Sequence, residues 1–364
     1  MQNGISDIVE HFAITGRPQA IEPLGSGHIN DTYKVTTAEQ ESPDYVLQRV
    51  NHVIFPDIPG LMRNMERVTR HIRDKMEQAG EQDINRRVLT VIPCKDGRLF
   101  YKDEIGNYWR MLLFITGGKT YDIVDSPQKA YRGGRAFGRF QAQLSDFPPP
   151  PLVETIPNFH DIERRLQTFW AVVQADPLGR VSAVQDEIEI VRNRTEEMTT
   201  LHKLGQAGKI PLRITHNDTK FNNILFDEND QVLCILDLDT VMPGFIHYDF
   251  GDAIRTCANT GAEDEKDLNE VSLDIKLFEA YARGFIEETG EFLEPLETEY
   301  LAFSAKLFAF AQGLRFLTDF INGDRYYKIH FEKHNLQRTR AQFKLLRSME
   351  KQYDVMKEII QKIL

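Results

Sequence analysis

Short runs of alternating apolar and polar residues fill the first third of the chain, and they predict a small β-sheet. The alternation is clearest over residues 45–50, and Gly25-Ser26-Gly27 interrupts the first two runs. One stretch, residues 61–76, instead places its apolar side chains on a single helical face. The predicted strands are residues 20–24, 32–36, 45–50, 88–92, 99–102 and 108–115.

Beyond Gly117 and Gly118 the apolar positions recur every three to four residues, which predicts long amphipathic helices. A β-like interval at residues 210–239 interrupts them. The pattern therefore predicts an α+β chain, with a small antiparallel sheet lobe (residues 1–118, ending in a hinge) and a larger, mainly helical lobe (residues 119–364). The predicted helices are residues 127–147, 161–174, 185–207, 273–288, 297–322 and 335–363, and the later strands are 212–215, 223–226 and 232–236.

The composition fits a soluble globular protein, and the net charge of -11 argues against a nucleic-acid partner or an anionic membrane surface. Cys94, Cys234 and Cys257 have no CxxC spacing and are expected to be buried thiols in a reducing compartment. Residues 1–14 lack the pattern of a signal peptide, and no apolar run reaches about 18 residues. The sequence therefore predicts a cytoplasmic localisation without a membrane span.

The most distinctive chemistry lies in residues 214–226, where His216, Asp218 and Asn223 have the spacing HxDxxxxN. Phosphoryl transfer needs an acceptor for the proton of the attacking hydroxyl and oxygen ligands for Mg²⁺. Asp218 is suited to the first task, and the amide oxygen of Asn223 to the second. Asp237, at the end of the next predicted hairpin, supplies a carboxylate for the same metal ion.

Other interpretations of these residues remain open at this stage. His216 and Asp218 would also suit a turn in which they only cap backbone groups, although the later Asp237 favours the catalytic interpretation. Lys220 is placed to offset charge on the transferred phosphoryl group. Asp239 has a position from which it would approach the metal, and a structural carboxylate suits that position equally well.

Residues 216–226 and 237–251 together resemble the signature of the aminoglycoside-phosphotransferase-like kinases. The resemblance implies a protein-kinase-like bilobal fold. It also implies the roles of four residues and a structural place for His216. Under it Asp218 is the base, Asn223 and Asp237 hold Mg²⁺, and Asp249 braces the loop.

Further segments resemble the N-acetylhexosamine 1-kinase group of that family, and they follow one another along nearly the whole chain. This resemblance implies phosphorylation of the anomeric hydroxyl of N-acetylglucosamine or N-acetylgalactosamine, with ATP and Mg²⁺ as cofactors. It also implies a sugar contact for His28. The segments are residues 25–33, 215–223, 237–244, 249–255, 261–268, 314–324 and 334–340.

On the nucleotide side, Gly25, Ser26 and Gly27 are expected to form a loop over the phosphates, although a plain hairpin turn fits this pair of glycines as well. Protein kinases place a lysine on the third strand to hold the phosphates, paired with a glutamate on the next helix. Here the predicted third strand, residues 45–50, contains no lysine. If Val46 packs in the core, strand alternation puts Gln48 at the lysine position.

Under the same alternation Arg49 points away from that position. Glu66, on the following helix, is a possible partner for Gln48 or an ordinary solvated residue. The adenine is expected to bond to backbone groups near Phe114 and Ile115, at the predicted hinge.

Candidate acceptor-binding residues are spread along the chain. Arg315 lies in an apolar helical pattern and needs either a substrate oxygen or a carboxylate such as Asp249 or Asp319. His330 and His334 have a spacing that suits a metal, but no third ligand is evident, and residues 263–267 are most simply a solvated acidic run. The candidate contacts to the sugar are His28, Asn30, Arg255, Arg315 and Tyr326.

The sequence thus predicts an N-acetylhexosamine 1-kinase whose partners are a nucleotide and a small sugar. Two alternatives remain. One is a kinase of the same fold with another acceptor, such as an amino alcohol, an aminoglycoside or a different sugar. The other is a non-catalytic nucleotide-binding pseudokinase, which the missing third-strand lysine favours and the intact Asp218, Asn223 and Asp237 disfavour.

Overall fold

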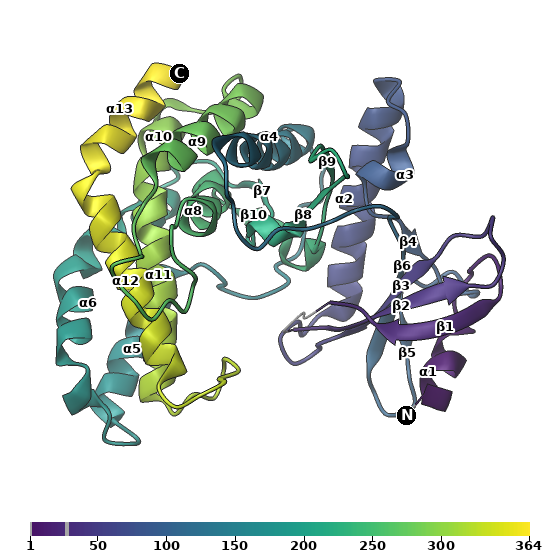
Figure 1. The fold of residues 1–364 in the computed structure, drawn as a ribbon, viewed down its shortest axis with the longest axis horizontal. Helices are drawn as coiled ribbons and strands as arrows, with labels where there is room; N and C mark the ends of the chain where they lie inside the picture. The colour runs from purple at the N-terminus through teal and green to yellow at the C-terminus, as the bar shows by residue number, and fades with distance from the viewer. Residues whose placement is uncertain (1, 26–28) are drawn as a thin grey trace. The chain divides into compact units, whose positions relative to one another are not determined.

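A computed structural model describes residues 2–25 and 29–364 of the chain. The described fold mixes helices with a small antiparallel sheet, as the sequence predicts, and it divides into two compact units (Figure 1). Unit 1 comprises Met1–Lys119, Asp146–Pro157 and Leu225–Met242. Unit 2 comprises Thr120–Ser145, Asn158–Ile224 and Pro243–Leu364.

An antiparallel sheet forms the centre of unit 1, with the strand order β1-β2-β3-β6-β4 and with β5 also paired to β6 (Figure 1). Tyr45 and Leu47 of β3 and Trp109 and Met111 of β6 lie in one hydrophobic cluster, because alternate side chains share a face. The strands are β1 (Pro18–Pro23), β2 (Asp31–Thr37), β3 (Tyr45–Val50), β4 (Val91–Ile92), β5 (Tyr101–Lys102) and β6 (Tyr108–Leu113).

Helix α2 (Ile58–Gln78) is the longest helix of unit 1 among the described residues, and it buries the predicted apolar face. Asp57 caps its first turn by accepting a hydrogen bond from the Gly60 N–H at 2.9 Å. The buried amide of Asn64 donates to the carbonyl oxygens of Val153 and Val241, at 2.8 and 3.1 Å. Asn64 therefore ties the two distant segments of unit 1 to this helix. The shorter helices are α1 (Gln2–Val9) and α3 (Ile84–Arg87).

Strands β8 (Ile224–Phe226) and β9 (Val232–Ile235) form the hairpin that the sequence predicts. Asp227 stabilises its turn, because its carboxylate accepts hydrogen bonds from the Asn229 and Gln231 N–H groups, both at 2.8 Å. After the hairpin, Asp237 takes a left-handed conformation (φ 53°) and begins the short helix η3 (Leu238–Thr240). Strand β10 (Met242–Gly244) follows and pairs with β7 (Arg213–Thr215).

Helices make up most of unit 2, and α4 and α9 pack side by side (Figure 1). Their backbones approach so closely that a Cβ atom on Gly134 would lie 2.1 Å from the carbonyl oxygen of Tyr281. The helices are α4 (Pro127–Leu144), α5 (Ile162–Ala175), η1 (Val181–Ala183), α6 (Gln185–Met198), α7 (Thr200–Gln206), η2 (Phe221–Asn223), α8 (Ile246–Cys257), α9 (Ile275–Thr289), α10 (Pro295–Glu299), α11 (Leu301–Ile321), α12 (His334–Lys351) and α13 (Tyr353–Ile363).

Several predicted element boundaries are wrong. Each of three long predicted helices is two helices, which meet at Thr199, Tyr300 and Gln352. Helix α8 was not predicted at all. The predicted strand at residues 88–92 is reduced to its last two residues, and α3 precedes it.

No helix within residues 2–25 and 29–364 is long and apolar enough to cross a membrane.

Candidate active site

The loop between β7 and η2, residues 216–220, carries the predicted base. The side-chain amide nitrogen of Asn223 donates to the Asp218 carbonyl oxygen at 2.8 Å and lies 3.4 Å from Asp218 Oδ2. Because its nitrogen is engaged in this way, Asn223 retains Oδ1 as an acceptor for a cation or donor. Lys220 Nζ lies 3.5 Å from Asp218 Oδ1. Asn223 and Lys220 therefore both lie against Asp218.

A second carboxylate, Asp249 of α8, stabilises this loop through hydrogen bonds. Its two oxygens accept hydrogen bonds from the backbone N–H groups of His216 and Asn217, at 2.8 and 2.7 Å, and Gln141 donates to it as well. The Thr219 hydroxyl donates to the Asp249 carbonyl oxygen at 2.7 Å. Asp249 is fully buried, and burial raises its pKa against the opposing effect of these donors.

His216 contributes to the shape of the loop from a fully buried position. Its ring packs edge-on against Phe137 and Phe140, and its Nδ1 accepts a hydrogen bond from the Asp218 N–H at 3.3 Å. Asn217 has a left-handed backbone (φ 66°), and Gly244 lies against it. A Cβ atom at Gly244 would come within 2.2 Å of Thr215 Oγ1 and 3.0 Å of Asn217 Oδ1. Only glycine leaves room for the loop at this point.

Charged side chains gather near Lys220 within unit 2. Arg255, which is 3% exposed, lies 2.7 Å from Asp252 and 3.0 Å from Glu263. Asp218 raises the pKa of the Lys220 ammonium most strongly, and Glu263 and Asp252 raise it further. Glu263, in the predicted solvated run at residues 263–267, is 41% exposed and also pairs with this buried arginine.

The pKa of the Arg315 guanidinium on α11 is raised: burial lowers it, but Tyr327 and Tyr326 raise it. Arg255 lowers this pKa and Asp252 raises it, so Arg315 belongs to the same electrostatic group. Its guanidinium lies 5.5 Å from the Tyr327 ring and 5.7 Å from the Phe159 ring, and it donates to Gln312 at 3.0 Å. The salt bridge to Asp249 or Asp319 that the sequence left open is not among its contacts.

Asp319 instead fixes the loop that carries Tyr326. Its carboxylate accepts hydrogen bonds from the backbone N–H groups of Arg325, Tyr326 and Tyr327, each at 2.9 Å. Asn335 donates to the same carboxylate at 3.0 Å. The Tyr326 side chain is 61% exposed, so it is accessible to a ligand.

His334, which the sequence places four residues after His330, is fully buried and contacts Asp264 at 2.9 Å. Within residues 2–25 and 29–364 no group of three or more histidine, cysteine or acidic side chains is arranged to hold a metal ion.

In unit 1, Gln48, which is predicted to lie beside the nucleotide, belongs to a buried network that the sequence did not reveal. Gln48 and Arg110 face each other on β3 and β6, and Arg110 Nε donates to Gln48 Oε1 at 2.9 Å. Arg110 Nη1 also forms a salt bridge with Asp239. Asn30 donates to the other oxygen of Asp239 at 2.7 Å and accepts from the Asn51 N–H at 3.0 Å.

This network gives structural roles to Asp239 and Asn30, and the same strands show where Arg49 and Val46 point. Both oxygens of Asp239 are engaged, which favours the structural interpretation of this carboxylate. Both polar atoms of the Asn30 amide are engaged too, so Asn30 has a structural task whether or not it meets a sugar. Arg49 is exposed and forms a salt bridge with Asp31, so it points away as expected. The premise about Val46 is wrong, because Leu47 lies in the core and Val46 on the opposite face, with Gln48.

The remaining nucleotide-side residues have separate surroundings. Gly25 has a left-handed backbone (φ 73°), and Ser26, Gly27 and His28 lie outside the described residues. Glu66 pairs with Arg70 at 2.7 Å, as a solvated helix residue does.

The predicted hinge residues lie just beyond β6. The Phe114 N–H donates to the Asp44 carbonyl oxygen at 3.0 Å, and Ile115 is 8% exposed. An adenine would therefore have to use other backbone groups than this N–H. Ile115, at the end of the predicted strand, is part of the core rather than an open surface.

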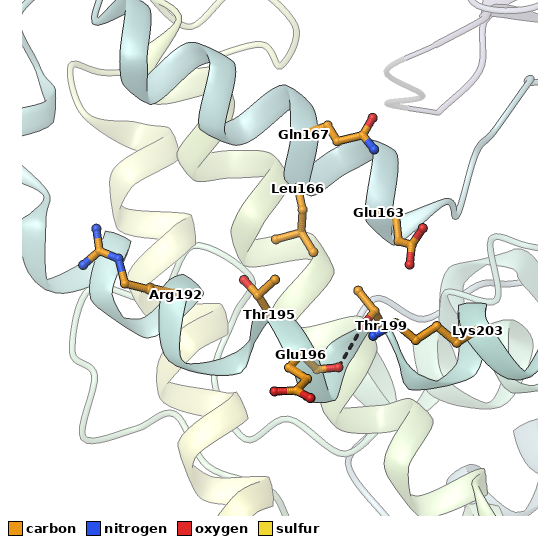
Figure 2. Close-up of a pocket in the computed structure, with 8 residues that line it drawn as sticks. All are labelled: Glu163, Leu166, Gln167, Arg192, Thr195, Glu196, Thr199 and Lys203. Carbon is orange, nitrogen blue, oxygen red and sulfur yellow. Dashed lines mark hydrogen bonds between the residues drawn. The ribbon is translucent and has the colours of Figure 1, made fainter.

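A groove of about 520 Å³ opens on the surface of unit 2, between α5, α6 and α7 (Figure 2). Figure 2 shows Glu163, Arg192, Glu196 and Lys203 around it, on segments remote in sequence from the catalytic loop. None of the predicted site residues lines this groove. The candidate site is therefore defined by side-chain geometry and not by this surface hollow.

Comparison with known proteins agrees with this geometry. Residues 20–288, which include the catalytic loop and Asp249, match the model of the phosphotransferase enzyme family. The match covers well over half of the chain, and the chain belongs to that family. Membership of this family identifies the chain as a small-molecule phosphotransferase.

Three solved structures with the same fold are distant in sequence. A microcompartment-associated aminopropanol kinase is 16% identical, with a TM-score of 0.61 and 98% of each chain covered. An amicoumacin kinase in complex with AMP-PNP, Ca²⁺ and Ami is 12% identical, with a TM-score of 0.62, covering 94% of this chain and 93% of that one. The choline kinase from Cryptosporidium parvum Iowa II is 15% identical, with a TM-score of 0.58, covering 100% and 98%.

Proposed function

We propose that this phosphotransferase transfers the γ-phosphoryl group of ATP to the anomeric hydroxyl of an N-acetylhexosamine. The observation that carries the choice of acceptor is the state of the carboxylates near Asp218. Asp252 and Glu263 are both engaged by Arg255, and Arg315 adds a further cation. Such surroundings suit a neutral acceptor rich in hydroxyl and carbonyl oxygens better than a cationic amine.

In the proposed reaction Asp218 accepts the proton of the anomeric hydroxyl as its oxygen attacks the γ-phosphorus in line. A bond forms between that oxygen and phosphorus, the bond to the bridging β–γ oxygen breaks, and ADP leaves. The Asp218 proton then passes to solvent. Lys220 offsets the charge on the transferred group, since it lies 3.5 Å from the Asp218 carboxylate.

Asn223 and Asp237 are assigned as the residues that would hold Mg²⁺, on the basis of their donor chemistry. An amide oxygen and a carboxylate are ligands that this ion prefers. The engaged nitrogen of Asn223 supports the assignment, because it leaves Oδ1 as the acceptor. When bound, the metal ion supplies charge neutralisation for the phosphates.

The other roles remain as the sequence predicted them. The segment Gly25, Ser26 and Gly27 is assigned to the nucleotide phosphates, with Gln48 beside them. Phe114 and Ile115 are assigned to the adenine. The assigned sugar contacts are His28, Asn30, Arg255, Arg315 and Tyr326.

The test is a panel of acceptors incubated with the protein, ATP and Mg²⁺, with ADP release measured and products identified by NMR. N-acetylglucosamine and N-acetylgalactosamine are compared with glucose, choline, ethanolamine, aminopropanol and an aminoglycoside. We expect the two N-acetylhexosamines to give 1-phosphates at the highest kcat/KM. Preferred transfer to an amine-bearing acceptor would refute the proposed substrate, and transfer to no acceptor would favour the pseudokinase.

A further inference from the structure

Unit 1 has an unusual distribution of cations around the third strand of its sheet. Protein kinases place a lysine on this strand for the α- and β-phosphates and pair it with a glutamate. Here Gln48 occupies that face of the strand, and the neighbouring Arg49 is exposed and paired with Asp31. The cation that does lie beside Gln48 comes from the adjacent strand, since Arg110 is its direct cross-strand partner.

Arg110 is held in one orientation by this environment. Its side chain is 1% exposed, and its hydrogen bonds to the described residues use Nε toward Gln48 and Nη1 toward Asp239. None of these bonds uses Nη2. Burying an ion pair costs desolvation energy, so such a pair seldom adds stability beyond what apolar residues would give. A fixed guanidinium with donors left over is suited to binding an anion.

The partners of Arg110 connect it to residues near those predicted to bind the phosphates and the metal ion. Asp239 lies two residues after Asp237 and also accepts from Asn30, which follows the glycine segment. Gln48 in turn donates to the Thr32 hydroxyl at 3.0 Å, near the start of the adjacent strand β2. The guanidinium is therefore fixed relative to Asn30 and to Asp239, which lies two residues after the predicted metal ligand Asp237.

We propose that Arg110 binds a phosphate oxygen of the nucleotide through Nη2 and takes the place of the missing third-strand lysine. Asp239 and Gln48 are its positioning residues, and Arg110–Asp239 replaces the lysine–glutamate pair. The proposal rests on the proposed function only in requiring that the protein binds a nucleotide. It does not depend on the identity of the acceptor.

The test measures binding of ADP with Mg²⁺, and of adenosine, by titration calorimetry. Because Arg110→Met alone strands a buried carboxylate, the main variant is Arg110→Met with Asp239→Leu, which removes both charges together. We expect the affinity for ADP to fall about 10- to 100-fold, as for the loss of a charge-assisted hydrogen bond. The affinity for adenosine should not change.

The matched control is Arg49→Met, which removes the other arginine from the same part of the sheet and should leave both affinities unchanged. Unchanged ADP affinity in the double variant would overturn the proposal. An equal loss for ADP and adenosine would also overturn it, because a purely structural role predicts that result. If the wild-type protein binds no ADP, the proposed function fails as well, whereas a negative acceptor panel alone leaves Arg110 unaffected.

Discussion

Two buried carboxylates, Asp249 in unit 2 and Asp239 in unit 1, organise the two regions that carry the candidate chemistry. Asp249 is held chiefly by the backbone N–H groups of His216 and Asn217, with the Gln141 amide as a further donor. Asp239 is instead matched by the guanidinium of Arg110. The first arrangement fixes a backbone loop, while the second fixes a charged side chain. The difference indicates that the loop at residues 216–220 depends on a fixed backbone shape, whereas the sheet of unit 1 depends on a fixed orientation of the Arg110 side chain.

The largest expected effect comes from replacing the predicted base, Asp218, while Asp239 and Asp249 remain unchanged. Asp218→Asn keeps the size of the side chain but cannot accept the proton, so kcat should fall about 10²- to 10⁴-fold. ADP binding should remain close to that of the wild-type protein, since the network of unit 1 is intact. Steady-state kinetics with the best acceptor and calorimetry with ADP measure the two quantities. Unchanged turnover would remove Asp218 from the mechanism.

The ease with which each region is recognised from sequence follows from its contacts. His216, Asp218 and Asn223 act within one short loop, so their spacing is visible along the chain. Asn30 and Asp239 are 209 positions apart, and only folding brings them together. Arg110 therefore looks like any polar residue in an alternating strand, and nothing in its local sequence indicates the salt bridge with Asp239.

The helices that were missed or mispredicted have a similar explanation. Helix α8 begins after Phe245, whose side chain makes no capping hydrogen bond, so the usual start signal is absent. The breaks at Thr199 and Gln352 involve neither proline nor glycine, and the apolar period continues through them. The sheet, the hairpin and the long helices could be predicted, because their periodicity and turn residues are local properties.

Asparagine at each of the two carboxylates tests the comparison directly. Asp239→Asn leaves a buried guanidinium without its counter-charge, and we expect the free energy of unfolding to fall by about 3–5 kcal/mol. Asp249→Asn removes only charge-assisted hydrogen bonds from neutral donors, and we expect a smaller loss of about 1.5–3 kcal/mol. Urea unfolding of each variant measures the change.

Restoring charge balance separates the two cases further. Adding Arg110→Met to Asp239→Leu should recover most of the stability that Asp239→Leu alone loses, because no buried charge is then left unpaired. The equivalent rescue does not exist for Asp249, whose hydrogen-bond donors are two backbone N–H groups and the Gln141 amide. Equal losses in the two asparagine variants would mean that the regions do not differ as described.

The smallest expected effect is a change of stability with pH that arises from a buried histidine in unit 2. His247 of α8 is fully buried and contacts the Glu297 carbonyl oxygen at 2.9 Å; burial lowers its pKa from 6.5 to about 4. The unfolded chain therefore binds a proton between pH 6.5 and 4 that the folded chain does not, so stability falls as the pH decreases through this window. At pH 5.5 the loss from this group is about 1 kcal/mol relative to pH 8.

His247→Gln should abolish this part of the dependence while keeping a donor for the Glu297 carbonyl oxygen. The substitution leaves the nearby ion pair of Glu297 and Arg213, whose side chains are 2.5 Å apart, in place. The measured quantity is the change in the free energy of unfolding between pH 8 and pH 5.5, which cancels any constant cost of the substitution. Parallel pH profiles for the variant and the wild-type protein would show that His247 is not a source of the acid sensitivity of unit 2.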